Sequence, residues 1–256
     1  MTLDKYLWLV NKNNLFDKKG LEKFDLLPIR DTDGKTYIES ETKKAFDDLR
    51  KYMEKTYGVA LFLTSAGRSV ETQQKVMDDL AKEMDEEELL KTVALPGTTE
   101  HHTGLALDVK PEIAHSSIIQ RFVNTLPIPE RIAYMKQPNK EEKDLMYANL
   151  HASLEQFGFI LRYTKDKQET TGFKPERWHI RYVGLENAKA MNEKGMCLEE
   201  YVEYLQSQSQ TELEDSEETA AKAEFDKNVQ QVIVVHPVVN KVFEEAKQAK
   251  QEEKVQ

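Results

Sequence analysis

A helical pattern and a strand pattern meet at a single glycine within residues 40–65, and this junction constrains the fold more than any other feature. Apolar residues recur at helical spacing over Ser40–Tyr57, and Gly58 follows where a left-handed cap would end a helix. The next run, Val59–Ser65, is rich in β-forming residues. The sequence therefore predicts an amphipathic helix that passes directly into a strand.

Other segments repeat this mixture of helices and short strands. Strand patterns occur at Leu105–Val109, Phe159–Tyr163 and Trp178–Val183. A second long helical pattern runs from Asn139 to Gly158, and two short helices broken at Gly195 follow the last strand. A further helix after Gly67 is marked by Val76, Met77, Leu80 and Met84. Helices mixed with short strands on hairpin-length links predict an α+β domain, with a mainly antiparallel sheet flanked by helices.

The composition changes near residue 206. The stretch 211–226 carries seven carboxylates against the single Lys222, and an apolar run at Val232–Val235 then precedes a break at Pro237. The chain of 256 residues is long enough for one sizeable domain with an appendage. The sequence therefore predicts a catalytic domain over residues 1–205 and, over 206–256, an acidic linker with a disordered or helical C-terminal tail.

Charge and cysteine content exclude several classes of function. The formal net charge of -10 opposes binding to a phosphate backbone, so nucleic acid is not an expected partner. Cys197 is the only cysteine, which rules out an internal disulfide and a cysteine-rich zinc site. Any bound metal must therefore be held by His, Asp or Glu.

The sequence also lacks the marks of export and of membrane insertion. No basic segment followed by an apolar run opens the chain, and no apolar stretch approaches the ~20 residues that span a bilayer. These observations predict a cytoplasmic protein without a membrane span. A cell-wall location stays open if the sequence is part of a longer chain, and the oligomeric state is not indicated.

Two separated motifs offer the groups of a metal site. The segment from Thr99 to Asp108 places His101 and Asp108 seven positions apart across a bend, and Glu176 precedes His179 by three residues. Three nitrogen or oxygen ligands, plus a nearby carboxylate that does not ligate, are what a hydrolytic zinc centre requires. Either histidine alone would more often be structural, so only the combined pattern supports a metal site. No ligand role is expected of the other histidines: His102, His115, His151 and His236.

The order of these motifs resembles the zinc D,D-carboxypeptidases and D,D-dipeptidases of the vancomycin-resistance type. That family has the pattern S-x-H-x-x-G-x-A-x-D followed by E-x-W-H, which this chain matches at residues 101–108 and 176–179. Residues 65–69 resemble the family's S-G-Y-R-S element, and the agreement extends over about residues 5–205. Three positions depart from the pattern: Thr99 replaces Ser, Gly67 replaces an aromatic residue and Arg177 replaces Pro.

This resemblance implies a hedgehog/D,D-peptidase-like zinc fold and a set of catalytic roles. His101, Asp108 and His179 would bind one zinc ion per chain, and Glu176 would be the catalytic base. The chemistry agrees, because zinc lowers the pKa of bound water toward ~7, where a neighbouring carboxylate can accept its proton.

The resemblance also implies a substrate and the residues that bind it. Arg68 would stabilise the oxyanion of the tetrahedral intermediate, and Ser69 and Gln73 would hold the substrate's terminal carboxylate. The implied reaction is hydrolysis of the terminal D-alanyl-D-alanine bond, either in peptidoglycan precursors or in the free dipeptide.

Two alternatives stay open beside the D,D-peptidase. One is a peptidoglycan endopeptidase that cleaves L-alanyl-D-glutamate bonds. The other is a zinc-binding interaction domain without catalysis, of the kind that hedgehog-type domains represent. Glu176 argues against the second alternative, because a purely binding role does not require an acid–base carboxylate. The region 112–143 is longer than in compact members of the family and is expected to form a lid or an elaborated loop.

Overall fold

A computed structural model describes residues 4–31, 34–85, 88–89, 93–114 and 138–211, together with Thr219, Lys222 and Glu224. Contacts divide the chain into one unit of residues 2–202 and a second unit that contains residues 203–256. The predicted linker and tail at 206–256 lie almost wholly outside the described residues, as do most of the expected lid and the histidines at 115 and 236. The proposed domain boundary therefore stays a prediction.

Among the described residues, the strands form two antiparallel sheets. A hairpin pairs β1 (Leu26–Asp31) with β2 (Gly34–Glu39). A four-stranded sheet has the order β3-β4-β6-β5, with every neighbouring pair antiparallel. Its strands are β3 (Val59–Ser65), β4 (Ala106–Ile113), β5 (Phe159–Tyr163) and β6 (Glu176–Tyr182). The predicted α+β class with a mainly antiparallel sheet is confirmed.

Caps define one end of each of the two longest labelled helices: the C-terminus of α1 and the N-terminus of α6. Helix α1 (Ser40–Tyr57) ends at Gly58, whose φ of 65° is left-handed and strained for residues with a side chain. Helix α6 (Lys140–Ser153) begins with a capping box between Asn139 and Glu142. Further α-helices are α2 (Val70–Leu80), α7 (Gln168–Thr171) and α8 (Leu185–Lys194), and residues 198–211 are also helical. The 3-10 helices are η1 (Lys5–Leu7), η2 (Lys18–Lys23), η3 (Glu100–Thr103), η4 (Glu155–Phe157) and η5 (Lys165–Lys167).

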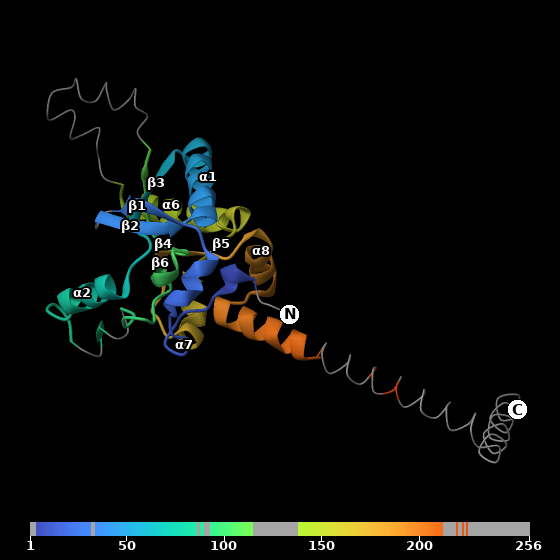
Figure 1. The fold of residues 1–256 in the computed structure, drawn as a ribbon. Helices are drawn as coiled ribbons and strands as arrows, with labels where there is room; N and C mark the ends of the chain where they lie inside the picture. Colours follow the sequence, from blue (N-terminus) through green and yellow to red (C-terminus); the bar gives the residue numbers. More distant parts are fainter. Residues whose placement is uncertain are drawn as a thin grey trace, which may run out of the picture. The chain divides into compact units, whose positions relative to one another are not determined.

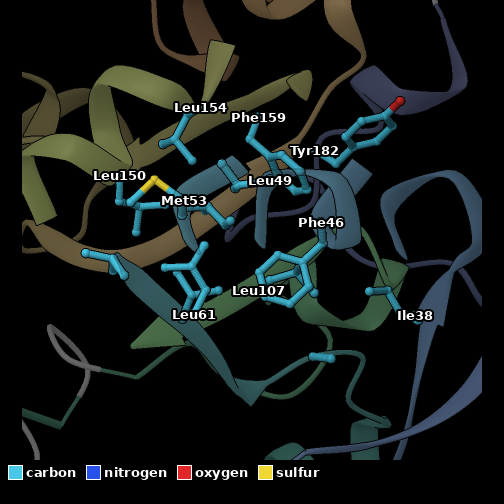
Figure 2. Packing of buried hydrophobic residues seen from close by; sticks show 14 of the residues in the cluster. Ile38, Phe46, Leu49, Met53, Leu61, Leu107, Leu150, Leu154, Phe159 and Tyr182 are labelled. Atoms are coloured by element: carbon cyan, nitrogen blue, oxygen red, sulfur yellow. The ribbon is translucent and has the colours of Figure 1, made fainter. Parts of the chain in front are cut away.

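Helices α1 and α6 lie beside each other against the four-stranded sheet, whereas α2 lies apart from them (Figure 1). Phe46, Leu49 and Met53 of α1 meet Leu61 of β3 and Leu107 of β4 in one apolar cluster (Figure 2). Burial of such side chains is the main favourable contribution to folding. Within the described part of the chain, no helix has the length and apolarity needed to cross a membrane.

This packing decides which face of the sheet carries polar groups. Leu107 pairs with Ile180 across β4 and β6, and both side chains are fully buried in the core. Successive side chains of a strand point to opposite faces. The next pair in the register, Asp108 and His179, therefore projects from the other face, away from α1 and α6.

Most predicted elements are confirmed, with shifts at some ends. The helix at 40–57 and the strands at 59–65 and 159–163 have the predicted bounds. Strand β4 continues to Ile113, and the helix predicted to reach Gly158 ends at Ser153 and is followed by η4. The sequence does not predict the β1–β2 hairpin, because Pro28 interrupts its first strand and weakens the strand pattern.

The core assignment predicts unequal costs for two identical substitutions. Leu61 is 1% exposed within the apolar cluster, whereas Leu145 on α6 is 61% exposed. Leu61→Ala should lower the free energy of unfolding by about 2 to 5 kcal/mol, because it leaves a cavity. Leu145→Ala should change it by less than about 0.5 kcal/mol. Chemical denaturation of both variants measures the difference, and equal losses would contradict this description of the core.

Candidate metal centre and active site

Three side chains from separate elements converge on one point. His101 lies on η3, Asp108 on β4 and His179 on β6. Each offers a ligand atom, and these atoms lie within 4.8 Å of one another. This is the one group of three or more potential metal ligands found among the described residues. The structure thus brings together the three ligands that the sequence predicts.

Hydrogen bonds on the outer side of each ring decide which nitrogen faces the centre. His101 Nδ1 lies 2.7 Å from the carbonyl oxygen of Ala66, and its Nε2 lies 3.4 Å from Asp108 Oδ2. His179 is oriented the opposite way, with Nε2 3.0 Å from Glu100 Oε1 and Nδ1 3.1 Å from Asp108 Oδ1. The inner nitrogens are therefore Nε2 of His101 and Nδ1 of His179.

The donor set fits a divalent cation. Asp108 Oδ1 is buried and lies 3.1 Å from the inner nitrogen of His179, but no hydrogen bond of standard geometry reaches it from the described residues, which is costly for a carboxylate oxygen. Although burial opposes it, the neighbouring His101 and His179 hold the pKa of Asp108 well below its usual range. Burial likewise opposes the charged form of His179, but the carboxylates of Asp108 and Glu100 raise its pKa to about 10. Two imidazoles and one carboxylate are a ligand set typical of catalytic zinc.

Glu176 lies next to this set without belonging to it. Its Oε2 is 3.6 Å from His179 Nδ1, and its side chain lines the cavity in front of the three ligands. Burial raises the pKa of Glu176 to about 7. A carboxyl group with such a pKa can both accept and donate a proton near neutral pH, as general acid–base catalysis requires.

Arg68 is held at the edge of the centre by neighbouring side chains. Its guanidinium donates to Gln73 Oε1 at 2.8 Å and to Ser65 Oγ at 3.0 Å, and it lies 3.8 Å from Asp108 Oδ2. Gln73 is 1% exposed, and its Nε2 donates to the carbonyl oxygen of Ala94 at 2.7 Å. Both ends of the Gln73 amide are thus engaged, one of them in positioning Arg68.

Ser69 stands apart from the other predicted site residues. Its hydroxyl accepts from Thr72 N at 3.1 Å and so caps the start of α2. The cavity is about 270 Å³ in volume and is lined by Arg68, Gln73, Glu176 and the three ligands, but not by Ser69. Thr99 also lines the cavity, and apolar and aromatic side chains complete its walls: Val76, Leu80, Val93, Ala94, Tyr163, Phe173 and Trp178. A larger cavity of about 380 Å³ beside β5 contains none of the predicted site residues.

Comparison with known proteins identifies this arrangement. The family model of VanY, described as D-alanyl-D-alanine carboxypeptidase, matches residues 35–185, which is more than half of the chain. The chain belongs to the VanY family. The predicted resemblance is therefore confirmed.

Curated relatives of the VanY family carry related names. A D-alanyl-D-alanine carboxypeptidase of Enterococcus faecalis is 34% identical over 57% of this chain and 48% of its own length. The putative carboxypeptidase YodJ of Bacillus subtilis is 31% identical over 66% of this chain and 55% of its own length. The chain therefore spans about half of these two relatives. A bifunctional D-Ala-D-Ala dipeptidase and carboxypeptidase of Enterococcus gallinarum is 32% identical over 78% of this chain and 94% of its own length.

Solved structures of VanY enzymes share the fold. VanYB in complex with D-alanine-D-alanine is 30% identical, with a TM-score of 0.59 over 78% of this chain and 98% of that chain. A VanY mutant in complex with Zn(II) is 29% identical, with a TM-score of 0.57 over 78% of this chain and 99% of that chain.

The structure explains two of the departures from the VanY pattern. Thr99 keeps the function of a hydroxyl, because its side chain accepts from His101 N and caps η3. Arg177 faces α6, where it pairs with Asp144 at 2.6 Å and lies over the ring of Tyr147. Neither change disturbs the ligands.

The third departure, Gly67, is matched by Tyr37 of the β1–β2 hairpin. A Cβ atom at residue 67 would lie 2.4 Å from both the ring and the carbonyl oxygen of Tyr37, so this ring fills the space next to the glycine. The Tyr37 hydroxyl lies 3.0 Å from the carbonyl oxygen of Arg68 and 3.1 Å from that of His102. The family pattern has an aromatic residue in this turn. Here the aromatic side chain comes from the β1–β2 hairpin and lies beside the turn.

Two further features of the VanY site concern residues outside the predicted set. His102 points away from the ligands, as expected, since Gly97 N donates to its Nε2 and its Nδ1 lies beside the carbonyl oxygen of Arg68. Sequence reasoning missed Glu100, which is 1% exposed and contacts Arg162, Arg181 and His179. Glu100 stands at a position that the S-x-H pattern leaves unspecified, so this pattern does not mark it.

The Tyr37 hydroxyl contacts the carbonyl oxygens of Arg68 and His102 and is expected to clamp this turn, which removal of the hydroxyl tests. Tyr37→Phe removes the contact with two backbone carbonyls and leaves the ring in place. It should lower the free energy of unfolding by about 1 to 2 kcal/mol. Tyr57→Phe is the control, because Tyr57 is 40% exposed at the end of α1 and should tolerate the change within about 0.5 kcal/mol. Denaturation curves that show equal effects would mean that the hydroxyl of Tyr37 does not clamp the turn.

Proposed function

We propose that this chain is a zinc peptidase that hydrolyses the terminal D-alanyl-D-alanine bond of peptidoglycan precursors or of the free dipeptide. The observation that carries the proposal is the convergence of three ligands with a non-ligating Glu176 and with Arg68 around one cavity. Relatives named as D-Ala-D-Ala carboxypeptidases and a similar structure in complex with D-alanine-D-alanine support this substrate.

The metal would be held by His101 Nε2, the carboxylate of Asp108 and His179 Nδ1. When bound there, zinc acidifies water and polarises the scissile carbonyl group. Asp108 is suited to this position because its buried Oδ1 faces the inner nitrogen of His179 at 3.1 Å and receives no hydrogen bond of standard geometry from the described residues. The similar VanY structure in complex with Zn(II) supports zinc over other divalent cations.

Glu176 is proposed as the acid–base group. It lines the cavity within 3.6 Å of the inner nitrogen of His179, so it can reach a water molecule that attacks the peptide carbonyl. Its carboxylate accepts the proton of that water and then donates it to the nitrogen of the leaving D-alanine. One residue thus serves first as base and then as acid.

Arg68 is proposed to stabilise the negative charge that develops on the carbonyl oxygen. Its guanidinium is already fixed by Gln73 and Ser65, so little reorganisation is needed when this charge appears. Ser69 and Gln73 are proposed to hold the terminal carboxylate of the substrate, which would require Ser69 to give up its cap on α2 and Gln73 its contact with the Ala94 carbonyl oxygen. Gln73 would act partly through Arg68, since its amide oxygen accepts from that guanidinium.

One alternative cleavage is favoured by a specific observation. The structure of an LD-carboxypeptidase, LdcB, is 26% identical, with a TM-score of 0.54 over 76% of this chain. Release of D-alanine from D-alanyl-D-alanine and from a peptide that ends in it would support the D,D-activity. Release only after an L-configured residue would favour an L,D-carboxypeptidase, and cleavage only after L-alanine would favour the endopeptidase.

Metal analysis tests the ligand set. The purified protein should contain about one zinc ion per chain, because one three-ligand group is described. His101→Ala should lose most of this zinc and its activity. His151→Ala is a matched control, because His151 lies on α6 and its Nε2 is 2.9 Å from the carbonyl oxygen of Arg177. Equal zinc retention in both variants would show that His101 is not a ligand.

Glu176→Gln separates catalysis from metal binding. The amide keeps the size of the side chain but cannot accept the proton of water. Turnover of D-alanyl-D-alanine should therefore fall by roughly a hundredfold or more, with zinc content nearly unchanged. Glu186→Gln, at an exposed position in the first turn of α8, should retain wild-type turnover. Full D-alanine release by Glu176→Gln would exclude Glu176 as the base.

A further inference from the structure

The carboxylate of Glu100 lies behind the metal centre and is completely enclosed. Its Oε1 is 3.0 Å from His179 Nε2, the ring nitrogen on the outer side of that ligand. Its Oε2 accepts from Arg162 Nε at 2.8 Å and from Arg181 Nη1 at 3.1 Å. One carboxylate oxygen of Glu100 thus contacts a proposed zinc ligand, and the other accepts hydrogen bonds from two guanidinium groups.

We propose that Glu100 is a positioning residue that fixes the ring and the tautomer of His179, so that Nδ1 presents its lone pair to zinc. Two guanidinium groups in contact keep Glu100 as a carboxylate, which can only accept hydrogen bonds. The nitrogen that faces it must therefore carry the proton. With a metal bound, the imidazole is neutral and carries one such proton, on Nε2, which leaves Nδ1 as the donor atom for the metal. This inference rests on the proposed zinc site.

The two histidine ligands differ in how they are fixed. His101 Nδ1 meets the backbone carbonyl of Ala66, which no substitution removes. His179 depends on a side chain, and this side chain is anchored by residues from distant parts of the sequence. The position of Glu100 is therefore the part of the ligand support that mutation can test.

The surroundings of Glu100 hold it in place from both sides. Arg162 also donates to the two oxygens of Glu199, at 2.8 and 2.6 Å. Arg181 donates to the carbonyl oxygens of Tyr6 and Trp8, at 3.0 and 2.9 Å. Two carboxylates thus balance two guanidinium groups, and neither arginine can swing away from Glu100 without losing its other partners.

Glu100→Gln should reverse the hydrogen bond to His179. The amide oxygen is held on the side of the two arginines, because an NH₂ group there would face only donors. The NH₂ group then faces His179 Nε2, which must become an acceptor and pass its proton to Nδ1. Zinc affinity should fall by roughly 10- to 100-fold, the usual effect of losing such a partner of a metal ligand.

Glu199→Gln is the matched control. It makes the same chemical change on the same Arg162 but does not touch His179. Its zinc affinity should stay within about threefold of wild type, well short of the loss expected for a partner of a ligand. Competition with a chromophoric chelator measures zinc affinity in all three proteins, and thermal unfolding of the zinc-free forms shows whether each is folded.

The outcomes separate this inference from the proposed function. A wild type that binds no zinc would overturn both, whereas a wild type and a folded Glu100→Gln protein with equal zinc affinity would overturn only the role of Glu100. Equal losses in Glu100→Gln and Glu199→Gln would show that the buried charges act on folding alone. If Glu100→Gln does not fold, nitrogen–proton correlation NMR of the zinc-loaded wild type decides. A slowly exchanging proton on Nε2 of His179 is expected, and its absence would refute the proposal.

Discussion

The pairing of β4 with β6 is the constraint on which the rest of the site depends. Their register places Leu107 opposite Ile180 in the core and, one step on, Asp108 opposite His179 on the other face. The apolar contacts that fix this register therefore also fix the distance between two proposed ligands. A slip by one residue would exchange the core and the polar face, so the hydrophobic core and the metal centre are specified by the same pairing.

Around this pair, three of the predicted site side chains are held in place by hydrogen bonds to neighbouring groups. His101 is held by a backbone carbonyl, His179 by Glu100 and Arg68 by Gln73. Such outer contacts restrict the rotamers, so the groups are in position before a ligand arrives. The contrast with Glu176 is informative, because the carboxyl group that is proposed to transfer protons is left facing the cavity.

The sequence predicts the ligands because their chemistry and their spacing are local. His101 and Asp108 flank one glycine bend, and Glu176 and His179 share one strand, so each half of the site forms a short motif. The supports of the ligands could not be predicted in this way. Glu100 is joined to Arg162 and Arg181 across 62 and 81 positions of the chain, and only the fold brings them together. The contact between Tyr37 and the turn at Gly67 could not be predicted for a different reason: the strand pattern of its hairpin is weak.

The buried charges of Glu100, Arg162, Arg181 and Glu199 are difficult to explain by stability alone. Removing such groups from water costs several kcal/mol for each ion, and apolar side chains of similar volume often stabilise a fold equally well or better. What an apolar cluster cannot do is orient an imidazole. A carboxyl group that stays charged can only accept hydrogen bonds, so it leaves the proton on the outer nitrogen of His179. In a dry interior it stays charged only if cations accompany it. Arg162 and Arg181 supply these cations, and the carboxylate of Glu199 balances the second positive charge that they introduce.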